Sequence, residues 1–151
     1  MEFKELVTAF GEKYGIEELS ADDGAFSLDI DGMQIEVFHN EVEDTLFICG
    51  VIGEAPAEGM DRFGTLLLEA NFLFQGTDGA TLSRNPDTKE YALVRALPLA
   101  LLDVDSFSSA LEKFINGLES WIKLLTDFRP IEAEAEKSAQ ESVPLGSFLQ
   151  V

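Results

Sequence analysis

The stretch from Leu66 to Leu102 constrains the fold most, because turn signals divide it into short segments that must pair with near neighbours. An apolar helix end leads through a glycine-bracketed turn at 76–79 into a strand over 80–84. The Asn-Pro-Asp-Thr sequence at 85–88 is typical of a tight turn and separates this strand from a second one over 90–97. Short connections join antiparallel strands, so the stretch predicts a β-hairpin that follows a helix.

A three-stranded unit is predicted upstream of that helix. Apolar and polar residues alternate over 26–30, and Asp31-Gly32 is a strong signal for a two-residue hairpin turn. The return strand covers 33–39, and a third strand over 45–52 is rich in β-branched and aromatic residues. Together the two hairpins predict an antiparallel sheet.

Three segments repeat apolar residues at the three- and four-residue spacing of an amphipathic helix: 2–14, 60–74 and 106–125. Asp105 is the expected N-cap of the last helix. The predicted order is therefore α-β-β-β-α-β-β-α, an α+β fold in which helices pack on a twisted antiparallel sheet. We expect residues 1–129 to form one domain with its own core.

The helix over 60–74 differs from the other two because apolar side chains occupy more than one of its sides. Leu68 and Phe72 lie off the stripe that its other apolar residues form. A helix that is apolar on several sides is usually buried on several sides. In a small protein this pattern indicates that the helix takes part in a subunit interface.

The charge balance is strongly acidic, with 29 acidic and 10 basic residues and a formal net charge of −19. It argues against nucleic acid, whose phosphates require Lys and Arg, and against anionic membranes, and it favours basic partners. The sequence MEFKELVTAF lacks the pattern of a signal peptide, and no apolar run is long enough for membrane insertion. A single cysteine allows no disulfide within the chain, so we expect a cytoplasmic protein.

Residue types that carry catalysis are scarce. His39 and Cys49 are the one histidine and the one cysteine, and both fall in predicted strands, where a structural role is the better interpretation. A zinc site lacks ligands, and the turn at 76–79 lacks the Lys-Ser/Thr of a phosphate-binding loop. We therefore expect no enzyme, no catalytic residue, no cofactor and no metal. The open alternative is a carboxylate-based hydrolase, which requires a pocket with two converging acids.

Beyond Pro130 the composition shifts to Ala, Glu and Ser, and the sequence ends in VPLGSFLQV. We expect residues 130–151 to form an acidic, flexible tail. The alternative is that its apolar end docks on the domain or on a partner.

The sequence LLLEANFLFQGTDGATLSRNPDTKEYALVRALPL, followed by the helix SFSSALEKFINGLESWIKLL, resembles the class I chaperones of type III secretion, the Tir-chaperone family. The resemblance extends loosely over residues 2–126 and rests on structural motifs. It implies a homodimer with the second helix at the two-fold interface, in agreement with the several apolar sides of that helix. The implied interface residues are Leu66, Leu67, Ala70, Leu73 and Phe74.

The resemblance also implies a function. Class I chaperones bind an extended N-terminal segment of a secreted effector and keep it soluble and secretion-competent, without ATP. Such a segment adds a strand to a sheet edge and places apolar side chains in surface patches. The alternative function is a dimeric α+β adaptor or regulatory domain that binds a folded protein. The expected effector contacts, for which filling of the core is the alternative, are Phe3, Val7, Phe10, Ile35, Val37 and Phe38.

Overall fold

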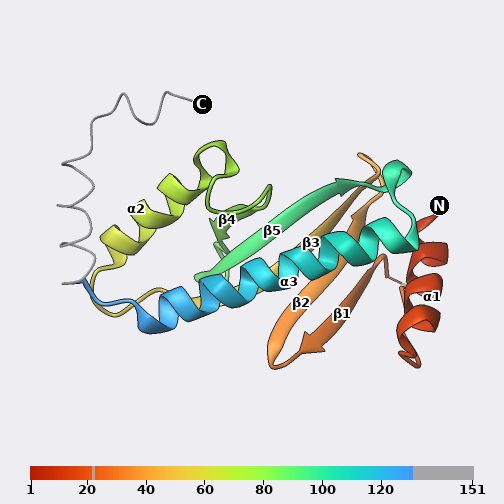
Figure 1. Cartoon of the computed structure of the whole chain (residues 1–151), viewed down its shortest axis with the longest axis horizontal. Coiled ribbons are helices and arrows are strands. Elements are labelled where there is room, and N and C mark those ends of the chain that lie inside the picture. Colours follow the sequence, from red (N-terminus) through yellow and green to blue (C-terminus); the bar gives the residue numbers. More distant parts are fainter. Residues whose placement is uncertain (22, 131–151) are drawn as a thin grey trace.

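The computed structural model describes residues 1–21 and 23–130 (Figure 1). The predicted tail lies outside the described residues from 131 onward. Helices and strands follow the predicted order, with two short 3₁₀ helices added. Their bounds are α1 Phe3–Tyr14, β1 Ala25–Ile30, β2 Met33–Asn40, β3 Thr45–Glu54, α2 Met60–Asn71, η1 Phe72–Phe74, β4 Thr81–Arg84, β5 Glu90–Pro98, η2 Leu99–Leu101 and α3 Val104–Asp127.

One five-stranded antiparallel sheet forms the centre of the molecule, with the strands in the order β1-β2-β3-β5-β4. β1 and β4 are therefore the edge strands. α3 crosses one face of the sheet, and α1 lies beside the amino-terminal half of α3, near β1 (Figure 1). α2 lies at the opposite end of the molecule from α1 (Figure 1).

Strand alternation separates the sheet into a core face and an outer face. On the core face, Val37 pairs with Phe26 on one side and Ile48 on the other, and all three are buried. The next residue, Phe38, pairs with Phe47 on the outer face, where the two rings stack with centroids 5.2 Å apart. β2 thus has one buried face and one outer face.

α3 packs closely against the central strand β3 at Gly50. A Cβ at this position would lie 2.5 Å from Cδ2 of Leu118 and 3.1 Å from Cε1 of Phe114, and both of these side chains are buried. Real Cβ atoms do not come that close to other carbons, so a larger residue would push α3 away from β3. Glycine at position 50 therefore sets the distance between helix and sheet.

The helix ends show one confirmed prediction and one correction. α1 ends at Tyr14, as predicted, and Gly15 follows it in the left-handed conformation with φ 64°. The N-cap of α3 is Asp103 and not Asp105, because Asp103 Oδ1 accepts a 2.7 Å bond from the Ser106 N–H and Ser106 Oγ accepts a 2.9 Å bond in return. Asp105 instead pairs with Lys13 at 2.9 Å and links α3 to α1.

α2 ends at Asn71, before the predicted end at residue 74. The Asn71 side chain bonds both backbone groups of Leu82, donating from Nδ2 at 3.0 Å and accepting at Oδ1 at 2.8 Å. After this clamp, Leu73 and Phe74 take φ values of 53° and 57°, in the left-handed region that such residues rarely adopt. The clamp ties the end of α2 to β4, and the chain turns away from the helix axis.

Candidate binding surfaces

Four large apolar side chains at the end of α2 and in η1 are exposed. Leu68, Phe72, Leu73 and Phe74 expose 73%, 66%, 68% and 52% of their surface, and we call this group the α2–η1 surface. Contiguous apolar exposure of this kind marks an interaction site in soluble proteins. Leu68 and Phe72 are not among the residues predicted for the interface, although their positions off the main stripe are the sequence signal for them.

The predicted interface residues divide between this surface and the core. Leu73 and Phe74 belong to the α2–η1 surface, whereas Leu67 is 5% exposed and packs in the core of the monomer. Leu66 and Ala70 are half-buried against that core. The role of these residues in a dimer stays a prediction, and Leu73 and Phe74 are the two that a partner can reach most directly.

Five of the six predicted effector contacts fill the core instead of forming a surface patch. Phe38 is the exception, since it lies on the outer face and is 36% exposed. Periodicity identified the apolar faces of the first helix and hairpin correctly, but these faces cover each other. The expectation of an exposed patch is therefore corrected for the residues that expose 6% or less, which are Phe3, Val7, Phe10, Ile35 and Val37.

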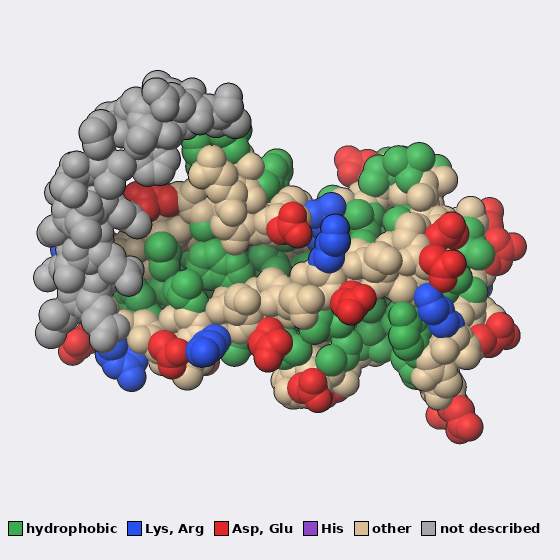
Figure 2. Space-filling view, viewed as in Figure 1, with side chains coloured by type: hydrophobic (Ala, Val, Ile, Leu, Met, Phe, Trp, Pro, Cys, Tyr) green, Lys and Arg blue, Asp and Glu red, His purple; other side chains and the backbone are tan. Residues whose placement is uncertain are grey.

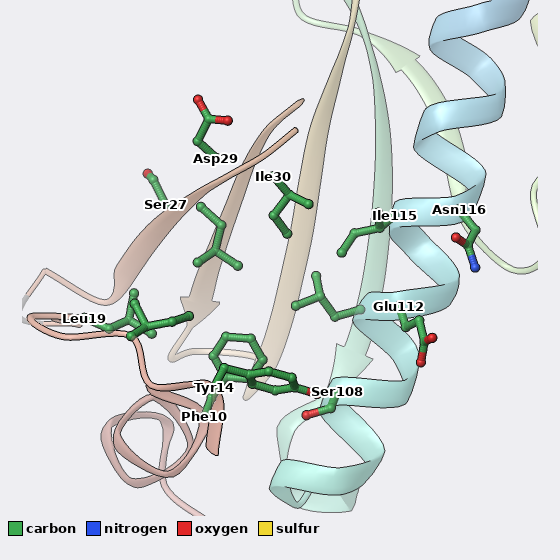
Figure 3. Close-up of a pocket in the computed structure, with 13 residues that line it drawn as sticks. Phe10, Tyr14, Leu19, Ser27, Asp29, Ile30, Ser108, Glu112, Ile115 and Asn116 are labelled. Carbon is green, nitrogen blue, oxygen red and sulfur yellow. The ribbon is translucent and has the colours of Figure 1, made fainter. Parts of the chain in front are cut away.

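A groove of about 680 Å³ opens between the end of α1, the edge strand β1 and the flank of α3 (Figure 3). Its walls are mainly apolar: Ile30 of β1 and Ile115 of α3 point into the same space, and the rings of Phe10 and Tyr14 lie together at one end (Figure 3). We call it the α1–β1–α3 groove. It could not be found from the sequence because its walls come from three separate segments.

The groove runs alongside the free edge of β1. Four consecutive residues, 27–30, line it; Ile30 points into the space, whereas the side chains of Ser27 and Asp29 point away from it (Figure 3). An edge strand presents unpaired N–H and C=O groups to any chain that lies beside it. An extended segment can therefore pair with β1 and place alternate side chains in the groove, which is the geometry of strand addition.

Acidic groups stand at the rim of this groove. Asp29 of β1 and Glu112 of α3 lie on opposite sides, and their carboxylates point away from each other (Figure 3). Two carboxylates in this arrangement do not converge on one bond as glycoside hydrolysis requires. The groove therefore gives no support to the hydrolase alternative, and its negative rim favours basic residues in a ligand.

The two residues considered for catalysis have structural surroundings. His39 Nε2 lies 2.9 Å from Asp44 Oδ1, and its ring stacks on Phe3 with centroids 5.4 Å apart. Burial, and to a smaller extent the charge of Glu36, raises the pKa of the Cys49 thiol, which makes it a poor nucleophile.

Within residues 1–21 and 23–130, no group of His, Cys, Asp and Glu is arranged to hold a metal ion. No helix in the described part of the chain has the length and apolarity to cross a membrane.

Comparison with known proteins gives a family match and a set of similar folds. Residues 5–122 match the Tir chaperone protein (CesT) family. None of the curated proteins matches the chain. The solved structures with similar folds include a chaperone–effector complex.

Three of these structures show the extent of the similarity. A chain of the ExsC-ExsE complex is 18% identical with a TM-score of 0.72, and the match covers 83% of this chain and 97% of that one. A chain of the HopA1-SchA chaperone–effector complex is 18% identical with a TM-score of 0.66, and the match covers 83% of this chain and 94% of that one. A chain of the heterodimeric ExoU-SpcU complex from the type III secretion system of Pseudomonas aeruginosa is 17% identical with a TM-score of 0.62. That match covers 82% of this chain and 98% of that one. These likenesses confirm the predicted α+β fold.

Proposed function

The chain belongs to the Tir chaperone protein (CesT) family, and we propose that it binds the extended N-terminal segment of a secreted effector and keeps that segment secretion-competent without ATP. Two of the similar structures support the same class of partner, since one is a chaperone–effector complex and another comes from a type III secretion system. A chaperone of this kind carries out no chemical step. Its place of action is the cytoplasm, where the effector is held before export.

The observation that carries this proposal is the position of the α1–β1–α3 groove beside an edge strand. An extended segment has unpaired backbone groups, which the free edge of β1 satisfies. Its apolar side chains leave water when they enter the groove, and this contributes about 25 cal/mol for each Å² of apolar surface buried. Both contributions arise at equilibrium, so binding requires no nucleotide hydrolysis.

The acidic surface supports the second part of the proposal, the maintenance of solubility. A net charge of −19 on each copy keeps complexes apart by repulsion, even when the bound segment is itself apolar. Asp29 and Glu112 at the groove rim extend this charge to the place where the segment lies. We therefore expect the preferred segment to carry basic residues next to its apolar anchors.

We propose that the α2–η1 surface joins two copies of the chain. A two-fold contact places the same patch on both copies, so Leu68 and Phe72 of one copy meet apolar side chains of the other. Burial of these residues removes apolar surface that is otherwise in water. Because α2 and α1 lie at opposite ends of the molecule, such a dimer leaves both α1–β1–α3 grooves open (Figure 1).

Capture of the natural partner tests the function. The tagged full chain is used to isolate bound protein from its native lysate after growth under secretion-inducing conditions, and the captured material is digested with a small amount of protease. We expect a protected N-terminal segment of one secreted protein, at about one segment for two chains, with no change when ATP is added. Capture of an intact folded partner, with no protected segment, would instead establish the adaptor alternative.

A further inference from the structure

A second cleft, of about 470 Å³, lies on the other flank of α3 from the groove. On α3, the groove is lined by Glu112 and Ile115 and the cleft by Lys113 and Gly117, while Asn116 lies between them and lines both. The remaining walls come from β5 and from the loop 75–79 that follows η1. We call this space the loop–α3 cleft, and the function described above makes no use of it.

Two cations border the cleft without an acidic partner. Neither Arg95 of β5 nor Lys113 of α3 forms an ion pair with any residue in the described ranges, although the chain has 29 acidic residues. Arg95 Nη1 donates a 2.6 Å bond to the carbonyl oxygen of Asp78, and its guanidinium rests against Gly79, which holds it at the cleft. Asp78 is the one acidic residue among those that line the cleft, so the charged lining residues are net positive. Figure 2 shows basic side chains side by side near the middle of this face, with acidic ones around them.

A hydroxyl without a partner lies in the wall of the same cleft. Thr77 is 8% exposed, and its Oγ1 has no hydrogen bond to any described residue. A buried hydroxyl that bonds nothing destabilises a fold, and most such groups in proteins have a partner. Rotation about χ1 is enough to change the direction of a threonine hydroxyl. The cleft therefore combines two cations with an unused donor.

The rest of the wall is apolar and well fixed. Leu93, Phe114 and Trp121 contribute to it, and the Trp121 Nε1–H donates a 3.2 Å bond to the carbonyl oxygen of Gly76 in the loop. This bond ties the loop to α3 and fixes one wall of the cleft. A ligand for such a site has an anionic group next to an apolar one.

We propose that the loop–α3 cleft binds the carboxylate of an acidic residue that stands next to an apolar residue in the bound extended segment. The inference rests on the proposed function, because the segment supplies the carboxylate. Arg95 and Lys113 pair with the carboxylate, Thr77 donates to it, and the apolar neighbour packs on Trp121. The negative field of the chain disfavours acidic segments elsewhere, so this site selects segments with an acid at one particular place.

Fluorescence of Trp121, the only tryptophan, provides the test. The full chain is titrated with N-acetyl-Phe-Glu-amide, and the matched control probe is N-acetyl-Phe-Gln-amide, which has the same shape and no charge. We expect a saturable change in emission with the glutamate probe and binding about tenfold weaker with the glutamine probe, because charge-assisted hydrogen bonds are the stronger ones.

Variants then locate the binding. Arg95→Gln with Lys113→Gln should weaken the glutamate probe by about tenfold or more. The control variant, Lys4→Gln with Lys123→Gln, removes the same charge from exposed positions that line neither cavity, and it should bind as the parent does. Thr77→Val keeps the shape and removes the hydroxyl, so it should weaken binding while the melting temperature stays equal or rises.

Three outcomes would overturn the proposal: equal binding of the two dipeptides, equal loss in the test and control variants, or tighter binding of inorganic phosphate than of the glutamate probe. The last outcome would identify a site for free anions instead of a polypeptide. The assay needs no effector, so its failure is separable from that of the function. Capture of a secreted segment without dipeptide binding refutes this site alone. Dipeptide binding without any captured segment refutes the proposed function, and the cleft then binds a carboxylate that such a segment does not supply.

Discussion

The two ends of the molecule present apolar surface to water in opposite ways. The α2–η1 surface protrudes, with Leu68, Phe72, Leu73 and Phe74 standing out from the end of a helix. The α1–β1–α3 groove is hollow, with apolar walls, an acidic rim and a free strand edge beside it. A protruding patch suits a second copy of the same patch, whereas a hollow beside a strand edge suits an extended chain. Shape, and not residue type, separates the surface that we propose for self-association from the groove that we propose for a ligand.

The largest effect in a test of this comparison is expected at Leu67, next to the α2–η1 surface in sequence but directed into the core. Leu67→Asp places an unpaired charge where the side chain is 5% exposed and should lower the free energy of unfolding by about 3–5 kcal/mol. Urea unfolding followed by circular dichroism measures the change. A folded, dimeric Leu67→Asp protein with an unchanged urea midpoint would show that the Leu67 side chain does not lie in the core.

The second effect concerns the neighbouring position, which points outward. Leu68→Asp combined with Phe72→Asp should weaken the dimer by about a hundredfold, because two charges from each copy would have to be buried at the contact. Light scattering during gel filtration gives the mass, and the unfolding midpoint of the isolated chain should change little. Persistence of the dimer at micromolar concentration would place the interface elsewhere, and the groove of the monomeric variant should still bind the captured segment.

The third effect separates the groove from the rest of α3. Ile115→Ala should weaken binding of the captured segment by about tenfold, since each CH₂ group no longer buried removes about 0.8 kcal/mol. Ile122→Ala is the matched control, because Ile122 is also half-buried on α3 but lies outside the groove. Calorimetric titration with the segment measures both. An equal loss in the two variants would move the segment away from the groove.

The smallest effect touches neither surface and sets the baseline for the others. Asp103→Ala removes the N-cap of α3 and should lower the melting temperature by a few degrees, while dimer mass and segment affinity stay unchanged. Hydrogen bonds from the Ser106 backbone and side chain lower the pKa of Asp103 in the folded chain. The contribution is therefore present above the ordinary aspartate pKa and is lost as the pH falls through the lowered one. Melting curves of the two proteins should converge in acid, and a constant gap would assign the effect to packing.

Local signals made much of the fold predictable. The Asp31-Gly32 pair has φ values of 53° and 82°, as a two-residue hairpin turn of this type requires, and Gly15 ends α1 in the left-handed conformation. The N-cap of α3 was predicted two residues too late, because Asp103 and Asp105 are equally good caps by residue type. Both have a serine three positions later, but only Ser106 exchanges bonds with its aspartate, whereas Ser108 Oγ donates to the carbonyl oxygen of Val104.

The surfaces were harder to predict because they depend on contacts between distant segments. Val37 and Phe38 are both apolar residues of one strand, yet Val37 is buried and Phe38 is exposed, and the sequence does not say which face α1 and α3 cover. No glycine or proline marks the end of α2, since the break follows from the bonds between Asn71 and Leu82. The loop–α3 cleft likewise unites residues from a loop, a strand and a helix.

The clamp at the end of α2 also affects how two copies would meet. Asn71 bonds both backbone groups of Leu82, so the left-handed turn that carries Leu73 and Phe74 is held in place within a single copy. Side chains on a fixed backbone lose little conformational entropy when a partner covers them. Two copies can therefore dock almost as rigid bodies, with rate and affinity governed by the fit of the surfaces and not by the folding of a loop.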